Sequence, residues 1–405
     1  MSTGPADPFP SAVAVETIPA DPPRRAISWA TTMSGVRDRS GIRLAHADSE
    51  PILGTVALAD RAAREDAEHR WMCDGATRAS AGGNRARFEP ADATRTCFER
   101  DRDRILHGTT AFRRLAGKTQ VFIFPDDHQR TRLTHALEVA QVATAVATAC
   151  RLNVALTDAI ALGHDCGHGP GGHASEDAFS PYLEGGYDHA VWGADVVLEP
   201  LNLCLQTLDG IRNHSWSRPA PNTPEGEVVS WADRIAYVCH DFEDAVLAGI
   251  VTAEMLPDMV RDRCGSTRTS QLNAFISSMV DVATSHGVVG MADDIADALA
   301  EFRRFNYHHI YMRPASIGQS ELVIRVLRSL VEFYADRPNT LPFADLGDLA
   351  TPGRLGDVAA GSPTALREAV TYVAGMTDRY AFQMAVTHLG WDPSSLPNGV
   401  DVRPR

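Results

Sequence analysis

The segment His164-Asp165-Cys166-Gly167-His168-Gly169-Pro170-Gly171-Gly172-His173 places three histidines and one aspartate among four glycines. Imidazole and carboxylate groups together can bind a divalent metal ion, and an imidazole can also donate or accept a proton near neutral pH. The His-Asp dipeptide is weak evidence by itself, because the chain contains a second one at His240-Asp241. A metal site therefore needs further ligands from other parts of the chain.

Two further candidate ligands, His135 and Asp233, lie in stretches whose apolar residues recur at helical spacing. Either residue alone is more often structural, since a lone histidine on an amphipathic helix is commonly a core or surface residue and Asp233 could pair with Arg234. With His164-Asp165 they would supply two imidazoles and two carboxylates and leave coordination positions open. This set suits Mn, Mg, Fe, Co or Ni to differing degrees, so it predicts a divalent metal ion without identifying it.

Several residues near these ligands are candidates for proton transfer or phosphate contact. His173 and Glu176 are three residues apart, a helical spacing at which a carboxylate can fix the tautomer of an imidazole that then acts as an acid. His168 is a candidate for supporting a ligand or contacting a phosphate. Arg132, three residues before His135 on the same predicted helix face, could bind a phosphate through two parallel hydrogen bonds.

Asp233, Tyr237 and Asp241 follow one another at intervals of four residues, so they lie on one face of a predicted helix. That face could form a pocket wall in which a metal ligand is followed by an aromatic ring against a sugar and by a carboxylate that accepts a hydroxyl group. The alternative for Tyr237 is an ordinary core position. This interpretation gives no role to His240.

The candidate metal-binding, catalytic and substrate-binding residues are expected to be positioned by helices. Apolar residues recur at helical spacing from about residue 95 onward, and strand-like alternation is scarce, so the predicted fold class is all-α. After a helix that begins near 131, further helices are predicted over 154–163, 174–183, 188–199, 228–249, 268–285, 290–306, 317–335 and 363–390. Proline and glycine predict loops over 215–227 and 334–353.

Composition restricts the class of protein. The 405 residues are 44% hydrophobic and carry a net charge of −14, which disfavours a protein whose main partner is nucleic acid. No apolar run is long enough to span a membrane and no secretory leader is recognisable, so no membrane partner is expected. Seven cysteines without a CxxC pair indicate free thiols in a reducing cytoplasm.

Six blocks of sequence resemble, in this order, those of the HD-domain phosphohydrolases, and among them the deoxyguanosinetriphosphate triphosphohydrolase, or dNTP triphosphohydrolase, family: RDRILHGTTAFRRLAGKTQVF, RTRLTHALEVAQVA, AIALGHDCGHGPGGHASE, LNLCLQTLDGIRNHS, ADRIAYVCHDFEDA and YVAGMTDRYA. The similarity is dense over 95–250 and recurs near 301–320 and 370–385. Two segments depart from the family pattern beside the expected substrate position. Pro-Gly-Gly-His at 170–173 replaces Pro-Phe-Gly-His, and Tyr187-Asp188-His189-Ala190 replaces an aromatic-Glu-His-Asn-like segment.

The resemblance implies an HD-domain helical bundle with additional C-terminal helices. It also implies metal-dependent hydrolysis of a dNTP, dGTP foremost, to deoxynucleoside and triphosphate. The implied metal ligands are His135, His164, Asp165 and Asp233. The implied catalytic residues are His173, Glu176 and His189. The implied substrate contacts are Arg132, Gln120, Lys118, His168, Arg234, Tyr237, Asp241 and Tyr307, although Lys118 could equally be a solvated surface charge.

The expected organisation is a peripheral or poorly ordered segment over 1–55, an extension with a mobile arginine-bearing loop over 56–94, an HD domain over 95–335, and a C-terminal helical region over 336–405 packed on or near it. A homo-oligomer is expected from the resemblance. A nucleotide activator and weak binding of single-stranded DNA are left open as further partners. Two alternative functions remain: an HD-type nucleotidase or phosphodiesterase on another phosphoester, and a regulatory protein that binds nucleotide or single-stranded DNA with little turnover.

Overall fold

The computed structural model describes residues 23–32, 35–37, 40–49, 53–80, 83–121, 129–341 and 358–397. The chain divides into two compact units, Met1–Leu58 and Ala59–Arg405. In the described part of the first unit, helix α1 (Arg24–Thr32) precedes an antiparallel pair of two-residue strands, β1 (Val36–Arg37) and β2 (Arg43–Leu44). The prediction for 1–55 falls largely on residues outside the described ones, and the predicted domain boundaries stay predictions.

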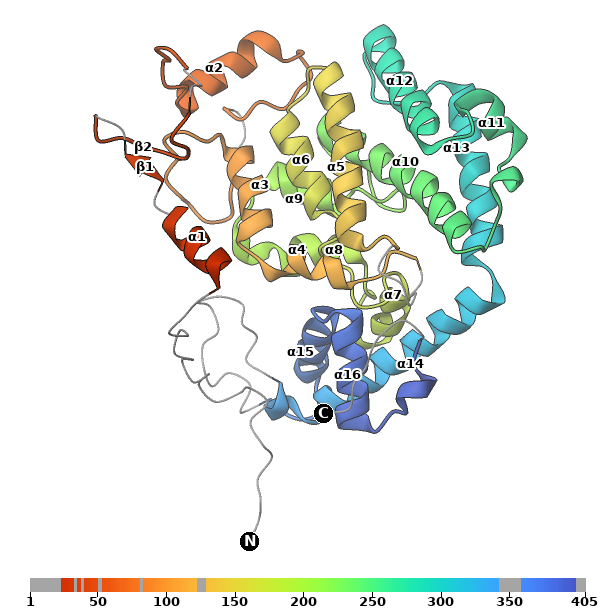
Figure 1. Cartoon of the computed structure of the whole chain (residues 1–405). Coiled ribbons are helices and arrows are strands. Elements are labelled where there is room, and N and C mark those ends of the chain that lie inside the picture. Colours follow the sequence, from red (N-terminus) through yellow and green to blue (C-terminus); the bar gives the residue numbers. More distant parts are fainter. Residues whose placement is uncertain are drawn as a thin grey trace. The chain divides into compact units, whose positions relative to one another are not determined.

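The second unit is built from helices (Figure 1). In its described residues they are α2 (Arg61–Trp71), α3 (Cys97–His107), α4 (Thr110–Arg114), α5 (Arg132–Ala149), α6 (Val154–Gly163), α7 (Ala174–Phe179), α8 (His189–Trp192), α9 (Leu205–Arg212), α10 (Pro224–Leu247), α11 (Asp258–Cys264), α12 (Arg268–His286), α13 (Asp293–Asn306), α14 (Pro314–Asp336), α15 (Pro363–Ala374) and α16 (Asp378–Leu389). The predicted all-α fold class is confirmed.

A first hydrophobic core holds α3, α5, α6, α9 and α10 together. α5 begins at a capping box made by Thr131 and Thr134, and α10 begins at Thr223 with Pro224 in its first turn. α6 is apolar on nearly every side because it packs against all four of the other helices, and its Ile160 is fully buried. This packing brings the C-terminal end of α6 next to α5 and α10.

A second hydrophobic core involves α7, α14, α15 and α16, which lie together in Figure 1. Its fully buried side chains include Phe179 and Phe382. The sequence predicted one helix over 363–390, and this is wrong. The segment Gly375-Met376-Thr377 separates α15 from α16, because Thr377 adopts an extended conformation and its side chain accepts a hydrogen bond from the backbone of Tyr380 to start a new helix.

Other helix boundaries differ from the prediction around the glycine-rich segment. α7 ends at Phe179 and continues as a 3-10 turn over Ser180–Tyr182, while α8 ends at Trp192 and continues as a π-helical turn over Gly193–Val197. α10 begins four residues earlier than predicted, since Thr223 and Pro224 supply its N-terminal signal. No helix of the described residues is both long and apolar enough to cross a membrane.

Candidate active site

A cavity of about 470 Å³ lies in the second unit and is bounded by α5, α10, α14 and a π-helical turn, Tyr307–Tyr311, that follows α13. Most of the candidate residues line it: Gln120, Arg132, His135, Asp165, His168, His173, His189, Asp233, Arg234, Tyr237, Asp241 and Tyr307. Three candidates are absent from the lining that the described residues form: Lys118, His164 and Glu176.

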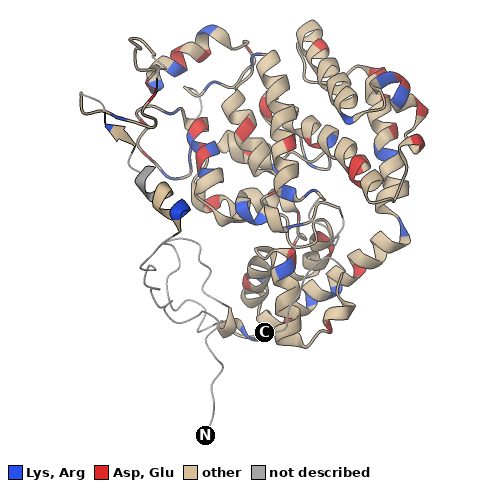
Figure 2. Cartoon of the chain, in the orientation of Figure 1, with Lys and Arg blue, Asp and Glu red and all other residues tan. Residues whose placement is uncertain are grey.

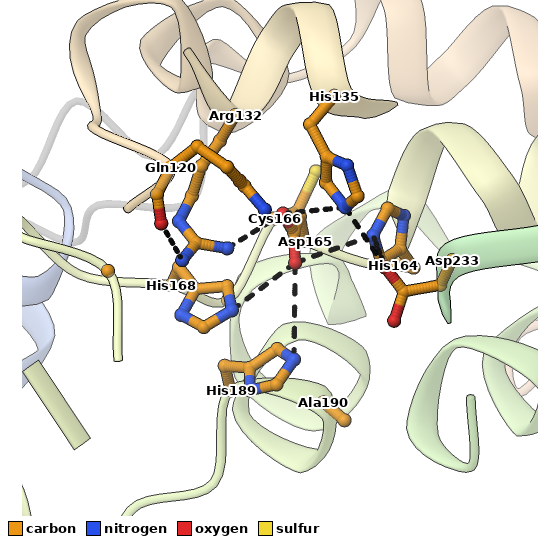
Figure 3. A network of polar contacts seen from close by, with 12 residues as sticks. Gln120, Arg132, His135, His164, Asp165, Cys166, His168, His189, Ala190 and Asp233 are labelled. Carbon is orange, nitrogen blue, oxygen red and sulfur yellow. Dashed lines mark hydrogen bonds and ion pairs between the residues drawn. The ribbon is translucent and has the colours of Figure 1, made fainter. Parts of the chain in front are cut away.

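The four candidate metal ligands come from α5, from α10 and from the segment that follows α6, and they converge (Figure 3). His135 lies in the first turn of α5, His164-Asp165 directly follows α6, and Asp233 lies on α10. Nε2 of His135 is 3.0 Å from Oδ1 of Asp233 and 3.9 Å from Oδ2 of Asp165. Nε2 of His164 is 3.4 Å from Oδ1 of Asp165 and 3.7 Å from Oδ1 of Asp233. Two imidazoles and two carboxylates therefore face one another at short range.

The imidazole of His164 fits a metal ligand. Its Nδ1 is 2.6 Å from the carbonyl oxygen of Ala161, so we assign the proton to Nδ1, which donates to that oxygen. Its Nε2 is buried and has no hydrogen-bond partner among the described residues. A buried nitrogen without a partner calls for a bound group. With the carboxylates of Asp165 and Asp233 beside it, this His/Asp cluster is consistent with a divalent metal site.

Asp165 is the centre of the polar network in Figure 3. Arg132 donates to its Oδ2 at 2.8 Å, and Nε2 of His168 is 3.2 Å from its Oδ1. Burial raises the pKa of Asp165, but Arg132 and the neighbouring imidazoles outweigh burial and hold that pKa well below its ordinary value. The carboxylate is therefore ionised, as a metal ligand must be. Arg132 thus orients a candidate ligand, and its contact with a phosphate stays a prediction.

Glu176 contacts His189 rather than His173, which corrects the predicted pairing. Oε1 of Glu176 is 2.6 Å from Nδ1 of His189, and Nε2 of His189 is 3.2 Å from Nε2 of His214. Nδ1 of His214 is 2.8 Å from the carbonyl oxygen of Ile211 and donates to it, so Nε2 of His189 donates to His214. Burial raises the pKa of Glu176 and lowers the pKa of His189 to about 3. Because Nε2 carries the proton of the neutral ring, we assign the proton between Nδ1 and Oε1 to the carboxyl group.

His173 lies on the same side of the cavity. It immediately precedes α7, and its exposed side chain lines the cavity. A spacing of three residues suggested that Glu176 would hold it, but the short α8 brings His189 onto that carboxyl group instead. His168 stacks on His189 with 3.7 Å between the ring centroids. Three imidazoles thus lie side by side, and His173 is the one most open to a ligand.

The wall that α10 forms has the predicted order of Asp233, Tyr237 and Asp241. The hydroxyl of Tyr237 accepts a hydrogen bond of 2.9 Å from Nε of Arg303 on α13. Oδ2 of Asp241 accepts a hydrogen bond of 2.5 Å from the hydroxyl of Tyr311. Both tyrosines of the π-helical turn, Tyr307–Tyr311, line the cavity, and such turns are frequent at functional sites.

Lys118 is buried and is not a surface charge. Its ammonium donates to the backbone carbonyls of His168 and Ala374, the latter at 3.0 Å. Asp378, whose charge acts on Lys118, accepts 2.8 Å hydrogen bonds from the backbone N–H of Thr119 and of the glycine segment before α7. These groups join the C-terminal helices to two segments that border the cavity. The structure therefore gives Lys118 a joining role, and its substrate contact stays a prediction.

Among the cavity-lining residues that sequence reasoning missed are His214, Trp216, Arg303 and Tyr311. The guanidinium of Arg234 lies over the ring of Trp216, 3.7 Å from its centroid. The block LNLCLQTLDGIRNHS ends beside Trp216, and Arg303 and Tyr311 flank Tyr307. The blocks indicated the right segments, but helical spacing could not show which side chains face the cavity.

The arginine-bearing loop is held by protein contacts where the structure describes it, over 76–80 and 83–95. Arg85 is paired with the buried carboxylate of Asp101 at 2.6 Å, and Arg87 is paired with Glu199 at 2.6 Å. Figure 2 shows acidic and basic residues interspersed on the helices of the second unit. The mobility of this loop and its binding of single-stranded DNA stay predictions.

Comparison with known proteins shows two matching domains. Residues 132–238 match the HD domain, and residues 289–386 match the phosphohydrolase-associated domain. A deoxyguanosinetriphosphate triphosphohydrolase-like protein from Caldanaerobacter subterraneus subsp. tengcongensis is 38% identical over 326 residues, which cover 78% of this chain and 92% of that protein. The chain belongs to this family.

A second deoxyguanosinetriphosphate triphosphohydrolase-like protein, from Clostridium perfringens strain SM101, is 37% identical over 313 residues, which cover 73% of this chain and 87% of that protein. The family assignment made from sequence blocks is confirmed, and the chain is an HD-domain phosphohydrolase. The matched HD domain contains all four candidate metal ligands, and the phosphohydrolase-associated match contains Arg303, Tyr307 and Tyr311.

Proposed function

We propose that this HD-domain phosphohydrolase hydrolyses a dNTP, dGTP foremost, to the deoxynucleoside and inorganic triphosphate. The main support is the single wall of α10, where Asp233 is followed at helical intervals by Tyr237 and Asp241 in one cavity. That order fits a phosphate held beside the metal ligands and a deoxyribose held beyond it. The similarity to deoxyguanosinetriphosphate triphosphohydrolase-like proteins supports the same class of substrate.

His135, His164, Asp165 and Asp233 would hold a divalent metal ion. When bound, such an ion lowers the pKa of a coordinated water and withdraws charge from a phosphoryl group. Arg132 keeps the carboxylate of Asp165 ionised and oriented, and Ala161 fixes the tautomer of His164.

We assign the proton for the leaving 5′-oxygen to the pair of Glu176 and His189. Nε2 of His189 is 4.0 Å from Oδ1 of Asp165, so the pair lies next to the candidate metal ligands. His173, whose side chain is exposed in the cavity, contacts the substrate directly. A water attacks the α-phosphorus as the bond from that phosphorus to the 5′-oxygen breaks. Nε2 of His189 exchanges its hydrogen bond to His214 for one to the 5′-oxygen and donates its proton there, while Nδ1 takes the proton of Glu176. The deoxynucleoside leaves, the three phosphates depart together, and the proton released by the attacking water restores the carboxyl group of Glu176.

The sugar end of the cavity supports a preference for deoxyribose. The hydroxyl of Tyr237 is fixed by Arg303, so its ring cannot easily move aside for a 2′-hydroxyl group. The carboxylate of Asp241 can accept a hydrogen bond from the 3′-hydroxyl group. We also propose a cytoplasmic homo-oligomer, because all seven cysteines are free thiols, as a reducing compartment requires, and because the family resemblance implies assembly.

The test is turnover of the four dNTPs and the four rNTPs by protein stripped of metal and then supplied with Mn²⁺. We expect turnover only with added metal and a strong preference for dNTPs. Turnover of nucleoside monophosphates or cyclic nucleotides without turnover of dNTPs would favour the nucleotidase or phosphodiesterase alternative. Tight nucleotide binding without turnover would favour the regulatory alternative.

A further inference from the structure

The second His-Asp dipeptide contains a histidine that is enclosed by two carboxylates. His240 is 1% exposed. Its Nδ1 is 2.5 Å from Oε2 of Glu138 on α5, and its Nε2 is 3.2 Å from Oδ1 of Asp241. Both distances lie within the range of ion pairs, so we infer that the imidazole pairs with one carboxylate on each side. The sequence interpretation gave His240 no role, and these contacts correct it.

Glu138 is fixed on its other side. Its Oε1 is 3.1 Å from Nε of Arg130 and 3.0 Å from a guanidinium nitrogen of Arg268 at the start of α12. Glu138, His240 and Arg268 also line a second cavity of about 210 Å³, separate from the one that holds the candidate metal ligands. The carboxylate that faces His240 is thus anchored by two arginines from different segments.

Asp241 receives contacts on both carboxylate oxygens. His240 approaches Oδ1, and the hydroxyl of Tyr311 donates to Oδ2 at 2.5 Å. Asp241 is 3% exposed, yet it lines the main cavity. Each carboxylate oxygen has two acceptor positions, so the two contacts leave acceptor positions open. The carboxylate is held in one orientation and still has capacity for a hydroxyl donor in the cavity.

We propose that His240 is a positioning residue that holds the carboxylate of Asp241 where it accepts the 3′-hydroxyl group of the substrate; this inference rests on the proposed dNTP substrate. Arg130 and Arg268 hold Glu138, Glu138 holds His240, and His240 holds Asp241. This series of contacts, from the two arginines to Asp241, is called the relay below, and it connects the second cavity to the sugar end of the main cavity. Its effect is selective recognition of a sugar that carries a 3′-hydroxyl group.

The test compares kcat/KM for dGTP and for 2′,3′-dideoxyGTP. We expect wild type to favour dGTP by about 10–100-fold, the usual contribution of a hydrogen bond to a charged group. His240→Gln can donate to only one of its two carboxylates, so the dGTP preference should fall to that of Asp241→Asn, with bound metal unchanged. His286→Gln, at the exposed end of α12, is the matched control and should keep the wild-type preference.

A double variant separates positioning from general destabilisation. If His240 acts through Asp241, the variant that carries both His240→Gln and Asp241→Asn should have the same dGTP preference as Asp241→Asn alone. Equal losses for both substrates in His240→Gln, or losses of preference that multiply in the double variant, would overturn the proposal. If His240→Gln does not fold, Glu138→Gln at the half-buried end of the relay takes its place and should lower the preference in the same direction.

The same assays distinguish failure of the proposed dNTP hydrolysis from failure of the proposed role of His240. Wild type that converts no dNTP would refute the proposed function and this inference with it. Wild type that hydrolyses dGTP and 2′,3′-dideoxyGTP equally well would leave the proposed function standing and overturn the role of Asp241 and His240.

Discussion

Replacing Glu176 with glutamine should lower kcat for a dNTP by about 10²–10⁴-fold, the range for loss of general acid catalysis. Glu176 is 2.6 Å from Nδ1 of His189, and His189 donates from Nε2 to His214. A glutamine amide can donate the same hydrogen bond to Nδ1, so the imidazole keeps its orientation. The amide cannot give up a proton. The substitution therefore isolates proton transfer, which corresponds to about 3–5 kcal/mol of activation free energy.

The assay is steady-state kcat at saturating metal and dNTP, with bound metal measured by mass spectrometry. Because both groups act through one hydrogen bond, Glu176→Gln combined with His189→Gln should be no slower than the slower single variant. Glu184→Gln, an exposed carboxyl group after α7, is the matched control and should have the wild-type kcat. A wild-type kcat for Glu176→Gln, or losses that multiply in the double variant, would refute the assignment.

Three further outcomes are expected. His135→Ala should lose both bound metal and turnover, whereas His173→Ala should lose turnover and keep the metal, as measured by mass spectrometry; metal retained by His135→Ala would contradict the ligand assignment. Gly172→Ala should weaken metal binding, because Gly172 has φ +64° and a Cβ there would lie 2.5 Å from the guanidinium of Arg132, which orients Asp165; an unchanged metal dissociation constant in calorimetry would oppose this. Light scattering at micromolar concentration should give a multiple of the 43.8 kDa chain mass, and a monomer would contradict the proposed homo-oligomer.

The sequence was sufficient to predict the helical fold, the family and the segments that meet at the cavity. Helical spacing and the types of the metal-binding side chains are local properties, so the order of Asp233, Tyr237 and Asp241 along one helix face could be predicted. The proximity of His135 to His164 and Asp165 was inferred from the residue types and from the family resemblance. Helical spacing alone could not predict this proximity, because the proximity depends on the packing of α5 against α6.

Contacts between distant segments could not be predicted from spacing. Lys118 can be buried because the backbone carbonyl of Ala374 accepts a hydrogen bond from its ammonium group, and the two residues are 256 positions apart. Glu176 could be matched only with the nearest histidine along the chain, since helical spacing does not show how the helix predicted over 188–199, which begins at His189 as α8, approaches Glu176. The contacts of His240 with two carboxylates could not be predicted for the same reason. Its partner Glu138 lies 102 positions earlier, on another helix.

Identification of the first products formed from dGTP tests the central claim most directly. The metal-supplied protein should release deoxyguanosine and inorganic triphosphate in equal amounts, seen by anion-exchange chromatography and phosphorus NMR. This result would place cleavage at the bond between the α-phosphorus and the 5′-oxygen. Deoxyguanosine monophosphate with pyrophosphate, or deoxyguanosine diphosphate with phosphate, as first products would contradict the account even if all four ligands bind a metal ion.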